Sequence, residues 1–116
     1  YVMESNGSNP TRLTNNAAID IAPAWARDGS KIAFHSFRDG TGEIYVINAD
    51  GTNETNLTND PGFDRFPDWS PDGTKIAFTR IPESGSWDIF VMNANGSNQT
   101  SLTNGPGRTW QPAWKP

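Results

Sequence analysis

The stretch Pro67-Asp-Trp-Ser-Pro-Asp-Gly-Thr-Lys-Ile-Ala-Phe78, followed by Asp88-Ile-Phe-Val-Met-Asn-Ala-Asn-Gly-Ser97, decides the fold of this chain. Apolar residues alternate with polar or small ones in both segments, which is the period-two pattern of β-strands. The Asp-Gly and Asn-Gly pairs favour tight turns, because Gly accepts positive φ and Asn or Asp tolerates it. The stretch therefore predicts short antiparallel strands joined by turns.

This pattern recurs along the 116 residues. Trp69 has counterparts in Trp25 and Trp114, at spacings of 44 and 45 residues. A Leu-Thr-Asn triplet repeats at the same spacings, beginning at Leu13, Leu57 and Leu102. Periods near 40–45 residues with four strands per unit are the sequence signature of β-propeller blades.

We expect an all-β chain of about two and a half to three propeller blades, each with four antiparallel strands. The expected strands of the two whole blades are residues 23–26, 31–34, 43–48 and 54–58, then 67–70, 75–78, 88–93 and 99–103. The blades divide the chain into the end of one blade (1–22), two blades (23–59 and 67–104) and a first strand (112–116). With two strands at the start and one at the end, the count is 11.

A closed propeller needs about four to eight blades. The ring is therefore expected to close only by oligomerisation or by further chain. The chain opens at Tyr1 and reads as a mature or excised piece. In each whole blade we expect the tryptophan, Trp25 or Trp69, to be buried between neighbouring blades. Its expected neighbours are Ile32, Phe34, Ile76 and Phe78.

The motif from Pro67 to Phe78, together with residues 88–97 and Leu102-Thr-Asn104, resembles the TolB-type propeller repeat, a relative of the tryptophan–aspartate repeats. The resemblance covers essentially the whole chain. The first unit departs from it with Ala26-Arg27, where Ser-Pro is usual. The family includes binding proteins, peptidase gating domains and a few polysaccharide lyases, so the resemblance specifies the fold more than the function. It implies a bacterial envelope protein, periplasmic or extracellular, similar to TolB, whose propeller binds a peptidoglycan-associated lipoprotein.

Composition excludes several classes of function. The net charge is −4 with no basic stripe, which argues against nucleic-acid binding. There is no cysteine for a disulfide or a thiolate metal site. No apolar run approaches the roughly 18 residues of a membrane span.

The repeats also predict where a partner binds. In a four-stranded blade, the first-to-second and third-to-fourth turns lie on one side of the ring. The second-to-third loops and the links between blades lie on the other side. The turns are near copies of one another, whereas the loops and links differ in large or charged residues. These are the candidates for binding: Phe63, Arg65, Trp87, Arg108 and Trp110.

Other polar residues are weaker candidates. Asp20 and Asp64, five residues before each blade tryptophan, either ligate a cation such as Ca²⁺ or accept backbone N–H bonds from the adjoining blade link. We favour the structural interpretation, because no dense Asp-x-Asp cluster accompanies them. His35 is the only histidine and is interpreted as an ordinary strand residue. We therefore expect no catalytic residue, no metal and no cofactor, and hence no enzyme.

The leading hypothesis is an interaction or scaffold module that binds a protein or peptide. One alternative is a carbohydrate-binding propeller, since Trp87 and Trp110 would supply stacking platforms. The other is an accessory domain of a larger hydrolase or lyase. The sequence names no ligand.

Overall fold

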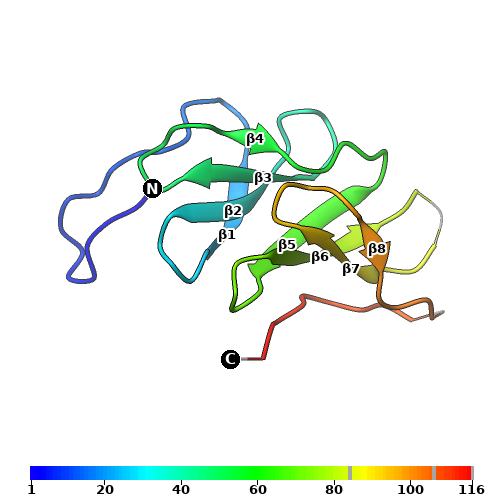
Figure 1. The fold of residues 1–116 in the computed structure, drawn as a ribbon. Helices are drawn as coiled ribbons and strands as arrows, with labels where there is room; N and C mark the ends of the chain where they lie inside the picture. The colour runs from blue at the N-terminus through cyan, green and yellow to red at the C-terminus, as the bar shows by residue number, and fades with distance from the viewer. Residues whose placement is uncertain (84, 106, 116) are drawn as a thin grey trace.

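A computed structural model describes residues 1–83, 85–105 and 107–115. Eight strands form two four-stranded antiparallel sheets, with the orders β1-β2-β3-β4 and β5-β6-β7-β8 (Figure 1). The strands are β1 (Asp20–Trp25), β2 (Lys31–Ser36), β3 (Glu43–Asn48), β4 (Thr55–Asn56), β5 (Phe63–Trp69), β6 (Lys75–Ile81), β7 (Asp88–Asn93) and β8 (Thr100–Ser101). Each sheet is one propeller blade, which confirms the expected fold class. None of the described residues belongs to a helix that could cross a membrane.

The first strand of each blade begins earlier than predicted and contains a bulge. The register of β1 with β2 shifts between Ile21 and Ala24. At this point Ala22 has a φ of 53° and precedes Pro23. Proline has no N–H for the ladder, so pairing is interrupted there and resumes on the N-terminal side. Phe66, before Pro67 in β5, has a φ of 54° and the same bulge.

The two ends of the chain differ from the expected count of 11 strands. Residues 1–14 form only an isolated bridge between Val2 and Thr11. Residues 110–115 form no ladder, although both the backbone N–H and the indole N–H of Trp114 bond to Asp68. A strand needs a neighbour to pair with, and the blades to which these ends correspond are incomplete in this chain.

The two sheets stack face to face and bury the main core between them. The first sheet contributes Ala33, Ile44 and Val46, and the second contributes Trp69, Ile76, Phe78 and Met92. The opposite face of the first sheet carries a second cluster, partly covered by two residues of the N-terminal segment, Val2 and Leu13. One face of the first blade is thus covered by a whole sheet and the other only by a short segment.

The unequal covering of the two faces corrects the prediction that both blade tryptophans are buried. Trp69 is 6% exposed and packs in the main core, as expected. Trp25 is 49% exposed, so the expectation that it is buried is wrong for this chain. The physical reason is that Trp25 belongs to the face that, among the described residues, is covered only by the short N-terminal segment.

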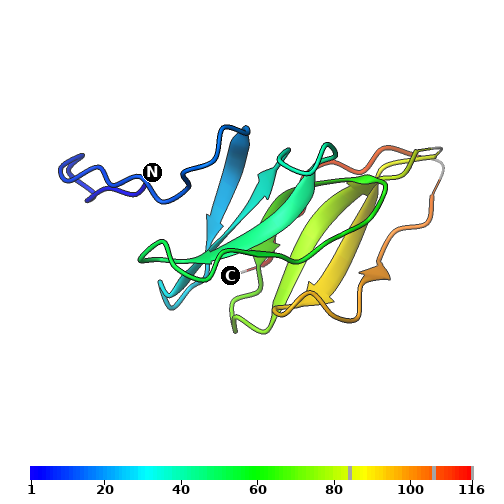
Figure 2. The ribbon, with the colours of Figure 1, turned by 90° about the horizontal axis from the view of Figure 1, so that it is seen from above.

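The turns and loops separate to opposite edges of the sheets. In Figure 2 the β1–β2, β5–β6 and β7–β8 turns lie along the lower edge. The β2–β3 and β6–β7 loops lie along the upper edge, together with the start of β1. We call the first edge the turn side and the second the loop side.

Candidate functional site

The turns on the turn side satisfy their own polar groups. The Asp72 carboxylate accepts hydrogen bonds from the Ser70 hydroxyl at 2.6 Å and from the Thr74 hydroxyl at 2.8 Å and backbone N–H at 3.0 Å. These bonds, led by that of Ser70, lower the pKa of Asp72 to about 2. Asp28 accepts the equivalent bonds from Ser30. Such Asx turns hold the backbone and leave the carboxylates less available to a partner.

Three of the five predicted binding residues form one cluster on the loop side. Trp87 lies just before β7, and Arg108 and Trp110 lie in the segment that follows β8. The two indole rings meet edge to face with centroids 4.7 Å apart, and the Arg108 guanidinium carbon lies 5.5 Å from the Trp87 ring. The Thr109 N–H donates to the Trp87 carbonyl at 3.0 Å and holds the two segments together. Trp110 remains 62% exposed.

The other two predicted residues form a second cluster in the seam between the blades. Arg65 places its guanidinium carbon 5.2 Å from the Phe63 ring and 5.8 Å from the Phe37 ring. Phe63 is partly accessible at the start of β5. Arg65 is paired with Thr79 of β6, whose hydroxyl donates to the Trp110 carbonyl at 3.1 Å. The two clusters therefore adjoin on the same side.

His35 was not among the predicted binding residues, yet it lies beside the second cluster. It is 1% exposed, and its ring meets those of Phe37 at 5.4 Å and Phe66 at 5.7 Å. Burial, and then the positive charge of Arg65, lower the pKa of His35 to about 4, so the imidazole is neutral at pH 7. The available signal was the repeat itself, because the next blade has Thr79 at this position.

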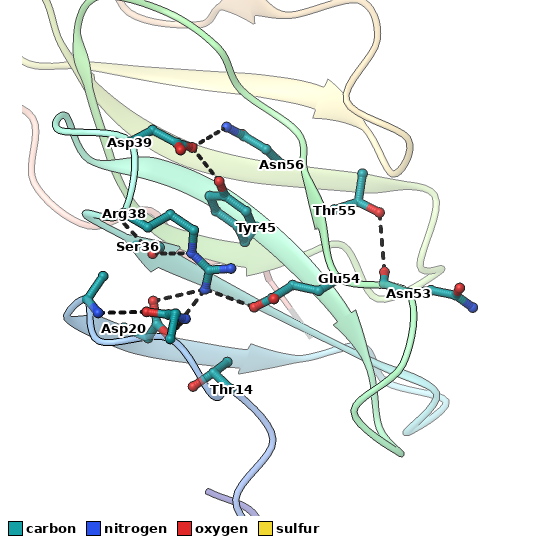
Figure 3. Close-up of polar contacts among 12 residues, drawn as sticks. Thr14, Asp20, Ser36, Arg38, Asp39, Tyr45, Asn53, Glu54, Thr55 and Asn56 are labelled. Atoms are coloured by element: carbon teal, nitrogen blue, oxygen red, sulfur yellow. Dashed lines mark hydrogen bonds and ion pairs between the residues drawn. The ribbon is translucent and has the colours of Figure 1, made fainter.

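Asp20 and Asp64 are held by arginines, not by the backbone N–H groups expected from the sequence. The Arg38 guanidinium lies 3.2 Å from Asp20 and 2.8 Å from Glu54, and stacks 4.2 Å from the Tyr45 ring (Figure 3). Burial alone would raise the pKa of Asp20, but hydrogen bonds from Ser36, Asn16 and Arg38 hold it below its usual value. The interaction is therefore structural.

The second blade repeats this network. Both oxygens of the fully buried Asp64 accept bonds from Arg80 at 2.7 Å, and Arg80 stacks 4.8 Å from the Phe90 ring. Across the part of the chain that the structure describes, no three His, Cys, Asp or Glu side chains come together as a metal site would require. The carboxylates of Asp20 and Asp64 thus bind arginine.

Four-stranded blades stacked in this way define a β-propeller protein. The model of the TolB β-propeller domain matches residues 1–62, which is more than half of the chain. The chain belongs to this family.

Individual relatives agree with this assignment. The chain is 42% identical over 45 residues to the Tol-Pal system protein TolB of Desulfosudis oleivorans, a match that covers 39% of the chain and 10% of that protein. It superposes on the crystal structure of TolB from Acinetobacter baumannii with a TM-score of 0.80 and 25% identity, over 92% of the chain and 27% of that structure. The chain thus spans about a tenth and about a quarter of these relatives.

An enzyme also shares the fold. The structure of oligogalacturonate lyase from Vibrio parahaemolyticus matches with a TM-score of 0.62 and 20% identity, over 87% of the chain and 27% of that structure. At this identity the likeness concerns the fold alone.

Proposed function

We propose that the chain is a non-catalytic interaction module that binds a protein or peptide partner through the loop side of its blades. The observation that carries the proposal is the cluster of Trp87, Arg108 and Trp110, in which two indole rings and a guanidinium converge from separate segments. Aromatic and Arg side chains dominate binding hot spots, because they offer large contact area and directional hydrogen bonds.

The cluster is suited to a partner because it is held in place and yet accessible. The bond from Thr109 to Trp87 and the bond from Thr79 to Trp110 fix the backbone of both segments. Trp110 remains largely exposed, so its contact with a partner would bury apolar area. Its ring already packs against Trp87, which limits the side-chain entropy that binding would cost. The turn side offers short turns whose carboxylates are already bonded.

The relatives support a setting for this function. A Tol-Pal system protein is among the relatives, and we extend its setting to a bacterial envelope location, in the periplasm or outside the cell, for this chain. The arginine-bound Asp20 and Asp64 favour binding over catalysis, because both carboxylates are already paired.

The test is a selection of peptides that bind the immobilised chain, from a displayed random library, followed by calorimetry. We expect Trp110→Ala to weaken the selected peptides about tenfold or more, as is typical of a hot-spot residue. The control Asp28→Asn, on the turn side, should leave affinity unchanged, and thermal melting should show both variants folded.

Two outcomes would contradict the proposal. One is a set of peptides weakened by Asp28→Asn and not by Trp110→Ala, which would place binding on the turn side. The other is an absence of peptide binding together with specific binding on a glycan array, which would favour the carbohydrate-binding alternative.

A further inference from the structure

The seam between the two blades contains a guanidinium that has no acidic partner among the described residues. The ion pairs of the described residues involve Arg38 and Arg80, each of which contacts two carboxylates. Arg65 is also partly buried, but it forms no ion pair among these residues, and its buried Nε has no hydrogen-bond partner there. Arg65 thus differs from Arg38 and Arg80.

Burying the Arg65 Nε–H without an acceptor costs free energy, and the neighbouring rings offset this cost only in part. A buried donor without an acceptor is unfavourable, and more so when it is charged. The rings of Phe37 and Phe63 lie within 6 Å of the Arg65 guanidinium carbon and provide cation–π attraction. These rings do not accept hydrogen bonds as a carboxylate would, so the forked donors of Arg65 remain available.

A second unpartnered nitrogen lies in the same seam. The Nδ1 atom of His35 is buried and has no hydrogen-bond partner in the described part of the chain. His35 is close enough to Arg65 for the guanidinium charge to act on it, and both side chains contact Phe37. A neutral imidazole carries one N–H and adds a donor or an acceptor without adding charge.

Apolar residues occupy the positions equivalent to Arg65 in the neighbouring units. Ile21 holds this position in the preceding unit and is 45% exposed, and Trp110 holds it in the following one. Strands β1 and β5 are in contact, and Trp110 bonds to Thr79, the β6 partner of Arg65. The loop side therefore presents a cation near the exposed Trp110.

We infer that Arg65 is a carboxylate-binding residue, which receives an acidic group next to an apolar side chain from the bound peptide or protein. This inference rests on the proposed function and specifies the chemistry of its partner. The guanidinium binds the carboxylate through two parallel N–H···O bonds, and the aromatic rings of Phe37 and Phe63 shield the pair from water. The apolar residue next to the acid contacts Trp110.

The probes are three small molecules that separate the possible sources of the carboxylate. Acetyl-Leu-Asp-amide carries a side-chain carboxylate, acetyl-leucine carries a terminal one, and acetyl-Leu-Asn-amide is the neutral match of the first. Each is titrated into the 116-residue chain at pH 7 and followed by the NMR signals of the Arg side-chain Nε–H groups. We expect at least one of the acidic probes to shift the Arg65 signal. The neutral acetyl-Leu-Asn-amide should bind at least about tenfold more weakly than that acidic probe.

His35 provides an independent readout. A carboxylate on Arg65 offsets the positive charge that helps to keep the pKa of His35 near 4, so this pKa should rise in the complex. The neutral probe should leave the His35 titration as it is in the free protein.

The matched variants are Arg65→Gln and Arg27→Gln. Arg27 is exposed in the β1–β2 turn, so its substitution removes the same charge from the opposite side. We expect Arg65→Gln to lose about tenfold in affinity for the acidic probe and Arg27→Gln to bind as the parent does. Arg65→Ile, which introduces the residue found in the preceding unit, serves if Arg65→Gln fails to fold.

The inference is overturned if the acidic and neutral probes bind equally, if neither acidic probe binds, or if Arg65→Gln or Arg65→Ile retains the full affinity. Each of these results would remove the carboxylate site without deciding whether the chain binds a peptide or protein. Peptides from the display selection that require Trp110 but tolerate Arg65→Gln would retain the interaction module and remove only its carboxylate site.

Discussion

The hydroxyl of Thr58 donates a hydrogen bond to the carboxylate of Glu43 and accepts one from the backbone N–H of Ile44 at 2.9 Å. Thr58 is the threonine of a repeated Leu-Thr-Asn triplet, and both it and Glu43 are buried. Burial raises the pKa of Glu43. In the next blade, Thr103 contacts Asp88 at 3.0 Å and the N–H of Ile89 at 2.9 Å. In both blades the hydroxyl of the triplet thus fastens the segment after the last strand to the start of the third strand.

Replacing Thr58 by Val should destabilise the chain by about 1–3 kcal/mol, because it leaves the Ile44 N–H and the Glu43 carboxylate without this partner in a buried place. Thr103→Val should cost less, since Thr103 and Asp88 are only partly buried. The measurement is the free energy of unfolding in urea. Equal losses for the two variants would show that burial does not determine the effect.

The two blade tryptophans should differ in the same kind of experiment. Trp69→Ala removes a large side chain from the main core and should cost about 3–5 kcal/mol. Trp25→Ala should cost about 1 kcal/mol, because half of this side chain is already exposed. Urea denaturation at low protein concentration compares them without association. A near-native stability of the Trp69 variant would contradict the packing.

His35 should make stability depend on pH. Its pKa is about 4 in the folded chain and about 6.5 when unfolded, so below pH 6.5 the unfolded state binds more protons. The contribution of the neutral side chain is complete above pH 6.5 and is lost as the pH falls toward 4. We expect a loss of about 2 kcal/mol between pH 7 and 5.

The control for this prediction is His35→Thr, which introduces the residue that the next blade has at this position. The acids Glu43 and Asp64 also titrate, so the relevant quantity is the difference between parent and variant at each pH. A difference that stays constant from pH 7 to 5 would mean that His35 is protonated to the same extent in both states.

The repeat predicted the fold because its signals are local. Alternation, turn pairs and the 44- and 45-residue spacings indicated both blades, and the third strands have the predicted bounds. The arginine networks were not predictable in this way. Arg38 and Arg80 both reach the aspartate of the first strand, yet Arg38 lies two positions further along its repeat. Long side chains reach the same place from different positions, so spacing alone does not reveal the pair.

The candidate site was predictable in part for a related reason. Differences between repeats indicated Phe63, Arg65, Trp87, Arg108 and Trp110, and the structure divides them into two adjoining clusters. Whether Arg65 has an acidic partner depends on which side chains the fold brings into the seam between the blades. The spacing of residues in the sequence does not indicate this. The exposure of Trp25 likewise depends on which blades are present beside it.

The outer face of the first blade leads to a last prediction, on assembly. A groove of about 130 Å³ on this face is lined by apolar residues that include Ile21, Trp25 and Ile32, and Tyr1 beside it is largely exposed. Exposed apolar surface of this kind favours association. We expect the 116-residue chain alone to sediment as a species heavier than 12.7 kDa, with a mass that rises with concentration. Trp25→Ser should shift the mass toward that of the monomer with little loss of secondary structure, because the side chain is half exposed. The control Asp28→Ser, on the turn side, should leave the mass unchanged. A folded 12.7 kDa monomer at every concentration would show that the N-terminal segment covers this face sufficiently.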